Sequence, residues 1–89
     1  MTPDEILKKA ADLISGERAK THGEYTRLHT RISDLWSSYL KINLTASQVA
    51  FCMVLVKVAR DEIGQPNPDD GLDASAYTAL WAALSQKNA

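Results

Sequence analysis

The middle of the chain holds its longest apolar run, from Val49 to Val56, and Lys57 and Arg60 follow this run at helical spacing. An amphipathic surface helix has one apolar stripe, whereas this run places apolar side chains on every side of a helix. The pattern predicts a central, largely buried helix over about residues 46–63. Because so short a chain has few other elements to cover it, either this helix is the central pillar of a small bundle or part of it is buried against a second copy.

Two helix starts are marked by capping boxes. Thr2 and Glu5 form the first box, directly before apolar positions with helical spacing, and they predict a helix over about residues 3–15. Thr45 and Gln48 form the second box, at the start of the central helix. Both boxes satisfy backbone N–H groups that a helix start leaves without partners.

The remaining two helices follow from the spacing of apolar side chains. One stripe predicts a helix over about residues 25–41. The last helix is expected to begin between Asp70 and Asp73, either of which can cap it, and to end near Gln86. Its expected buried face comprises Leu72, Ala76, Tyr77, Leu80, Trp81 and Leu84. Residues 1–89 are therefore predicted to form a single all-α domain, a small four-helix bundle.

Charge and cysteine content narrow the classes of partner. Ten Lys and Arg against eleven Asp and Glu give a net charge of −1, which does not favour binding to duplex nucleic acid. A single cysteine leaves no internal disulfide to stabilise so small a core, so we expect a homo-oligomer. With no signal peptide and no apolar run of membrane-spanning length, the chain is predicted to be cytoplasmic and to have no membrane partner.

Two groups of charged residues are candidates for chemistry. Lys57 and Arg60, three positions apart on one helix, can clamp a phosphate, or they can solvate the helix end and favour its dipole. Asp70 and Asp73 can bind Mg²⁺ through oxygen ligands, cap the last helix, or orient Arg60. The pattern leaves these alternatives open.

The polar connection before the second helix is a third candidate. Arg18, His22 and Tyr25 can contact a nucleotide by pairing with phosphate and stacking on a base, or they can simply be solvated. Tyr77, in the last helix, needs a polar partner for its hydroxyl when the ring is buried. The structural alternative is a polar network between the last two helices, formed by Lys57, Arg60, Asp73 and Tyr77.

Most of the chain resembles a family of small, functionally uncharacterised, all-helical phage and prophage proteins. The motifs that carry the resemblance are His22-Gly23, the RIxxLWSxYL pattern at 31–40, the DVAxxMxLLKxAR pattern at 48–60 and the DxxGY pattern at 73–77. Two departures from the family pattern stand out, because Gln48 replaces an acidic residue and Ala76 replaces a glycine. The resemblance implies a phage-encoded protein that acts in the cytoplasm of a bacterial host.

Together, these features predict a non-catalytic protein that binds and sequesters a nucleotide-type small molecule. The phage context points to a cyclic-nucleotide or ADP-ribose-type signal of host immunity, and so to an anti-defence role. The expected ligand-binding residues are Arg18, His22, Tyr25, Lys57, Arg60, Asp73 and Tyr77. No cofactor or metal is expected in this interpretation.

Two alternative functions stay open. The order of elements is loosely similar to that of the all-α nucleotide pyrophosphohydrolases, which would make the chain a Mg²⁺-dependent enzyme with Asp70 and Asp73 as metal ligands. Those enzymes also use an ExxE motif, and this chain contains none. The other alternative is a protein-binding inhibitor of a host factor that acts through an apolar helix face.

Overall fold

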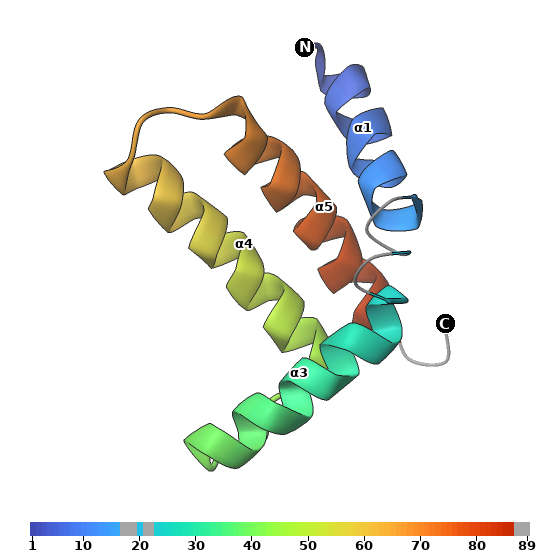
Figure 1. Ribbon diagram of the computed structural model, residues 1–89, viewed down its shortest axis with the longest axis vertical. Helices are drawn as coiled ribbons and strands as arrows, with labels where there is room; N and C mark the ends of the chain where they lie inside the picture. The colour runs from blue at the N-terminus through green and yellow to red at the C-terminus, as the bar shows by residue number, and fades with distance from the viewer. Residues whose placement is uncertain (17–19, 21–22, 87–89) are drawn as a thin grey trace.

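Four helices make up the fold in the computed structural model, which describes residues 1–16, 20 and 23–86 (Figure 1). They are α1 (Pro3–Ser15), α3 (Tyr25–Leu40), α4 (Ala46–Ile63) and α5 (Pro68–Leu84). No strand occurs within these described ranges. The prediction of an all-α fold is confirmed, and α1, α3 and α4 begin at the predicted residues.

Both predicted capping boxes are formed. The hydroxyl of Thr2 accepts from the backbone N–H of Glu5 at 3.2 Å, and the Glu5 carboxylate accepts from the N–H of Thr2 at 3.2 Å. At the start of α4, Thr45 accepts from the N–H of Gln48 at 3.2 Å, and the Gln48 side chain accepts from the N–H of Thr45 at 2.9 Å. These local bonds fix where each helix begins.

The predicted start of α5 is wrong, because the helix begins earlier, at Pro68. The Asn67 side chain caps it by accepting from the backbone N–H of Asp69 at 3.0 Å. Proline suits the first helical position, since the N–H that it lacks would have no partner inside the helix. Asp70 therefore lies buried within the first turn, and neither it nor Asp73 is the cap.

Helix α5 occupies the middle of the fold, between α4 and α1, and α3 crosses at one end of this layer (Figure 1). The core between α1 and α5 is formed by Ala10, Leu72 and Ala76, against which apolar side chains of α1 pack. On the other side, Val49 and Ala50 of α4 are completely buried.

The single chain does not bury α4 as predicted. Within α4 only Val49 and Ala50 are buried, whereas Leu55 and Val58 are about half exposed. The physical reason is the order of the layer: α5 has a neighbour on each side, but α4 lies at an edge. No helix in the described part of the chain combines the length and apolar character needed to cross a membrane.

Candidate ligand-binding site

A hollow of about 390 Å³ lies where the four helices converge, and it is called the four-helix hollow below. Leu13 lines it from α1, Tyr25 and His29 from α3, Lys57 from α4, and Tyr77 and Leu80 from α5. Its wall is mostly apolar and aromatic, with a few polar groups. This composition is typical of small-molecule sites, and the volume lies near the lower end of their range of about 300–1,000 Å³.

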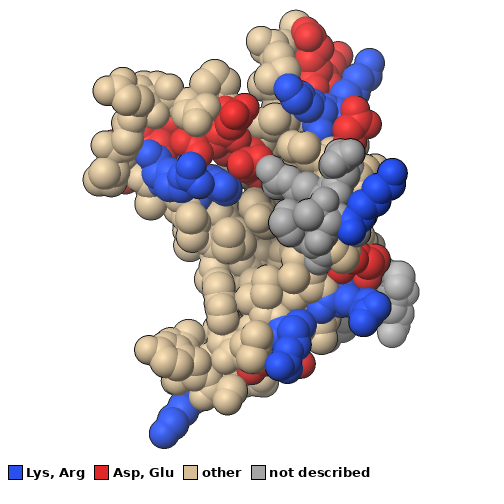
Figure 2. All heavy atoms as spheres, in the orientation of Figure 1, with Lys and Arg blue, Asp and Glu red and all other residues tan. Residues whose placement is uncertain are grey.

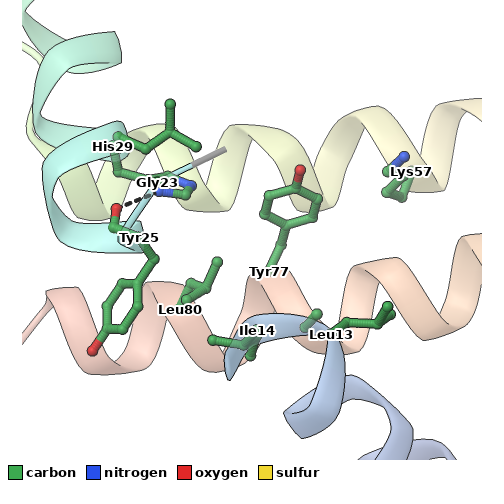
Figure 3. Close-up of a pocket in the computed structure, with 10 residues that line it drawn as sticks. Leu13, Ile14, Gly23, Tyr25, His29, Lys57, Tyr77 and Leu80 are labelled. Atoms are coloured by element: carbon green, nitrogen blue, oxygen red, sulfur yellow. Dashed lines mark hydrogen bonds between the residues drawn. The ribbon is translucent and has the colours of Figure 1, made fainter. Parts of the chain in front are cut away.

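Three of the predicted site residues line this hollow although they come from three helices. Figure 3 shows Tyr25 and Lys57 at opposite ends, with Tyr77 between them. The hollow therefore has an aromatic end and a cationic end.

The start of α3 determines where Tyr25 lies. The Glu24 carboxylate caps the helix by accepting from the backbone N–H groups of Thr26 at 2.9 Å and Arg27 at 3.2 Å. The bond from Thr26 is the main cause of the lowered pKa of Glu24. Just before this cap, Gly23 has a φ of +87°, a conformation that side chains with a Cβ rarely adopt. The turn and the cap together bring Tyr25, the first residue of α3, to the rim of the hollow.

Lys57 is held at the cationic end by Asp73. Its Nζ lies 3.3 Å from the Asp73 Oδ2, and the two side chains are only 12% and 16% exposed. This ion pair joins α4 to α5 and brings the predicted residue Asp73 into the site through Lys57. Because both groups are mostly removed from water, their attraction is screened less than that of a surface pair.

Arg60 does not join Lys57. Its Nε lies 3.8 Å from the Oδ1 of Asp70, and its side chain is 60% exposed, whereas that of Asp70 is 7% exposed. Arg60 lines a separate hollow at the C-terminal end of α4. Each cation of the predicted clamp thus faces its own aspartate on α5, and the two ion pairs connect α4 to α5.

The predicted metal ligands, Asp70 and Asp73, are the acidic partners in these two ion pairs. Asp70 faces Arg60 and Asp73 faces Lys57, so each carboxylate already lies beside a cation. Among the residues that the structure describes, no group of three or more His, Cys, Asp or Glu side chains is placed to hold a metal ion. These positions favour a structural use of both aspartates.

His29 is a site residue that the sequence analysis did not single out. Its ring is buried, and its Nδ1–H donates to the backbone carbonyl of Tyr25 at 2.8 Å (Figure 3). Because a carbonyl only accepts, this bond places the proton of the neutral ring on Nδ1 and makes Nε2 an acceptor. The ring meets Tyr77 edge-on, with centroids 6.3 Å apart. The four-residue spacing from Tyr25 was the available signal, since it puts both residues on one helix face.

Two predicted ligand contacts, Arg18 and His22, lie outside the described residues.

Comparison with known proteins gives the family. Residues 5–85 match the family described as "Domain of unknown function (DUF6378)". The Gene 55 protein of Mycobacterium phage L5 is 33% identical over 76 residues, which cover 84% of this chain and 49% of that protein. The Gene 55 protein of Mycobacterium phage D29 is 34% identical over 74 residues, which cover 83% and 49%.

The chain thus spans about half the length of the curated relatives that it matches. No solved structure matches it. The similarity to phage proteins agrees with the family resemblance found in the sequence. The chain belongs to the DUF6378 family.

Proposed function

We propose that the chain binds a nucleotide-type small molecule in the four-helix hollow and sequesters it without chemical change. The observation that carries this proposal is the convergence of Tyr25, Tyr77 and Lys57, from three helices, on one hollow. An aromatic end and a cationic end are the two features that a nucleotide needs, because it combines a flat base with an anionic phosphate.

The base would lie at the aromatic end. Tyr25 and Tyr77 offer ring surfaces, and base–aromatic stacking contributes about 1–3 kcal/mol per base. In the tautomer set by its bond to Tyr25, His29 presents Nε2 as an acceptor for an amino group of the base or a ribose hydroxyl. Leu13 and Leu80 would cover the remaining apolar surface.

The phosphate would lie at the cationic end, on Lys57. Asp73 would orient the lysine through the existing 3.3 Å contact, and the anion would approach Lys57 from the open side of the hollow. Arg60, which lines another hollow, is assigned the role of joining α4 to α5 through Asp70.

The size of the hollow bears on the ligand class. A volume of about 390 Å³ suits one nucleotide unit, so a larger cyclic nucleotide or an ADP-ribose-type molecule would extend beyond the rim. The similarity to phage proteins favours a signal of host immunity in the bacterial cytoplasm as the ligand, and hence an anti-defence function.

Calorimetric titration tests the proposal with three probes: AMP, cyclic di-AMP and ADP-ribose. We expect at least one probe to bind equally well in EDTA and in Mg²⁺, and to be recovered intact by chromatography. Hydrolysis that depends on Mg²⁺ would instead support the pyrophosphohydrolase-like alternative. Failure of all three probes to bind would contradict nucleotide sequestration in this hollow.

Matched variants locate the binding. Tyr25→Leu removes a ring from the hollow, whereas Tyr39→Leu removes a largely exposed ring elsewhere on the same helix. We expect Tyr25→Leu to weaken binding by about 10-fold or more, consistent with the loss of one stacking contact, and Tyr39→Leu to have no effect. Equal affinities for the two variants would place the ligand outside the four-helix hollow.

A further inference from the structure

One side of α4 carries large apolar side chains that the described chain covers only in part. Phe51, Leu55 and Val58 are 39%, 52% and 45% exposed, and they recur at the i, i+4 and i+7 spacing of a single helix face. Trp81 of α5 lies beside Phe51, with ring centroids 5.0 Å apart and planes at 56°. These four residues are called the outer stripe below.

Two of the outer-stripe residues, Phe51 and Leu55, lie on a part of α4 that has no charged residues, whereas Val58 lies between Lys57 and Arg60 in the sequence. From Ala46 to Val56 the helix contains no Lys, Arg, Asp or Glu. Figure 2 shows the α4 margin of the molecule indented between α3 and the loop that follows α4, with uncharged atoms lining the indentation. Depletion of charge around aromatic and aliphatic side chains is characteristic of the centres of protein interfaces.

The chain also exposes more surface than its mass requires. Its accessible surface is 6497 Å², whereas a compact 9.8 kDa monomer exposes about 5,200 Å². Its radius of gyration is 13.6 Å, compared with about 12 Å for a compact domain of this length. The excess in accessible surface area is larger than the roughly 800 Å² that each partner buries in a stable interface.

We propose that a second copy of this chain covers the outer stripe, with α4 packed antiparallel to α4 of the partner and Leu55 near the two-fold axis. A two-fold interface uses the same patch on both copies, so the three α4 residues of the outer stripe, centred on Leu55, can pack against their copies. The α4–α5 pairs of the two copies would then form a four-helix arrangement, which closes the edge of the layer.

Charge selects the antiparallel direction. The outer stripe continues along its face to Glu62, one helical turn beyond Val58. In a parallel pair, Glu62 would face Glu62 of the partner, and like charges would repel. In an antiparallel pair centred on Leu55, Glu62 instead faces the start of α4 in the second copy, near the uncharged Gln48.

This interface is independent of the four-helix hollow. Leu55 and Lys57 are two positions apart on α4, which separates them by about 200° around the helix. Lys57 faces the hollow and Asp73, so the outer stripe points away from the proposed ligand. Loss of one property should therefore leave the other intact.

Sedimentation equilibrium of the whole chain, from low to high micromolar concentration, tests the interface. We expect the wild type to reach twice the 9.8 kDa chain mass. Leu55→Glu should raise the dimer dissociation constant by roughly 100-fold or more, because it places a charge in the interface core from both copies. The matched control is Leu7→Glu, which changes a similarly exposed leucine of α1 and should leave the dimer unchanged.

Circular dichroism separates dissociation from unfolding, and Leu55→Glu should keep its helix signal because Leu55 is about half exposed in the single chain. A wild type that stays monomeric at every concentration would overturn the proposal and leave the outer stripe to a different protein. A dimer that resists Leu55→Glu but dissociates with Tyr39→Glu would overturn it as well, since the interface would then lie on α3.

Crosslinking tests the direction of packing. In a Cys52→Ser background, copies carrying Glu62→Cys and copies carrying Gln48→Cys should form a disulfide with each other when mixed and oxidised. A disulfide between two copies that both carry Glu62→Cys would show parallel packing and overturn the antiparallel arrangement.

Discussion

The two faces of α4 have similar apolar composition but different surroundings. On the inner face, Val49 and Ala50 are completely buried and Lys57 pairs with Asp73 of α5. On the outer face, Leu55 is about half exposed. Apolar composition therefore shows that a helix needs covering, but the position of its neighbours decides which face is covered within the chain. In the two proposals above, the inner face serves folding and ligand contact, and the outer face contacts a second copy.

The largest expected effect on the free energy of unfolding comes from a substitution on the inner face. Val49→Ala removes two methyl groups from a completely buried position, which should lower the free energy of unfolding by about 2 kcal/mol. Leu55→Ala, on the outer face, should change it by less than about 0.5 kcal/mol at concentrations where the chain is monomeric. Urea denaturation followed by circular dichroism measures both. Similar losses for the two variants would contradict the difference between the faces.

The next largest effect is expected from breaking the ion pairs that join α4 to α5, and it should differ between the two pairs. Lys57→Met leaves the largely buried carboxylate of Asp73 without its lysine, and we expect a loss of about 2 kcal/mol in unfolding free energy. Arg60→Met should cost less than about 1 kcal/mol, because the arginine is mostly exposed and Asp70 lies in the first turn of α5, where the helix dipole favours a negative charge.

The same denaturation measurement ranks these two variants. If Arg60→Met is less stable than Lys57→Met, the more exposed ion pair contributes more to the free energy of unfolding, which would contradict this ranking.

A smaller effect of opposite sign is expected on the exposed side of α5. Gly71 is helical, and a Cβ added there meets no atom within 4 Å. Gly71→Ala should therefore raise the unfolding free energy by about 0.5–1 kcal/mol. Gly16→Ala should lower it, because the added Cβ would lie 2.7 Å from the Asp12 carbonyl oxygen. Thermal melts of the two variants should shift in opposite directions, and a shared direction would contradict this account.

The smallest effect concerns the cap that positions Tyr25. The backbone N–H of Thr26 lowers the pKa of Glu24 in the folded chain. This contribution to stability is present above the unfolded pKa and is lost as the pH falls through the folded pKa. Glu24→Gln should therefore reduce the difference in melting temperature between neutral and acidic pH. An unchanged pH dependence would show that the Glu24 cap contributes little.

Local signals account for most of what the sequence predicts about the fold. The boxes at Thr2 and Thr45 mark α1 and α4 because capping depends only on residues three positions apart. The start of α5 was misplaced because several residues of this loop can cap a helix. Asn67 followed by Pro68 is the pair that does so, and its asparagine and proline are also a recognisable signal.

The site is less predictable, because it depends on how helices cross. Tyr25, Lys57 and Tyr77 were identifiable as candidates from their chemistry, but only the crossing of α3 over the layer brings them to one hollow. Arg60, three positions after Lys57, is turned by about 60° and reaches a different aspartate. His29 was missed because its role arises from burial and from the bond to Tyr25.

Native mass spectrometry, with AMP, cyclic di-AMP and ADP-ribose present together, tests the assignment of the two faces of α4 most directly, because it reports oligomer mass and bound mass at once. We predict that the wild type is a dimer carrying one of these nucleotides. Leu55→Glu should be a monomer that still carries it, and Lys57→Gln should be a dimer without it. Loss of both properties in either variant, or a wild type that shows neither, would contradict the division of function between the two faces.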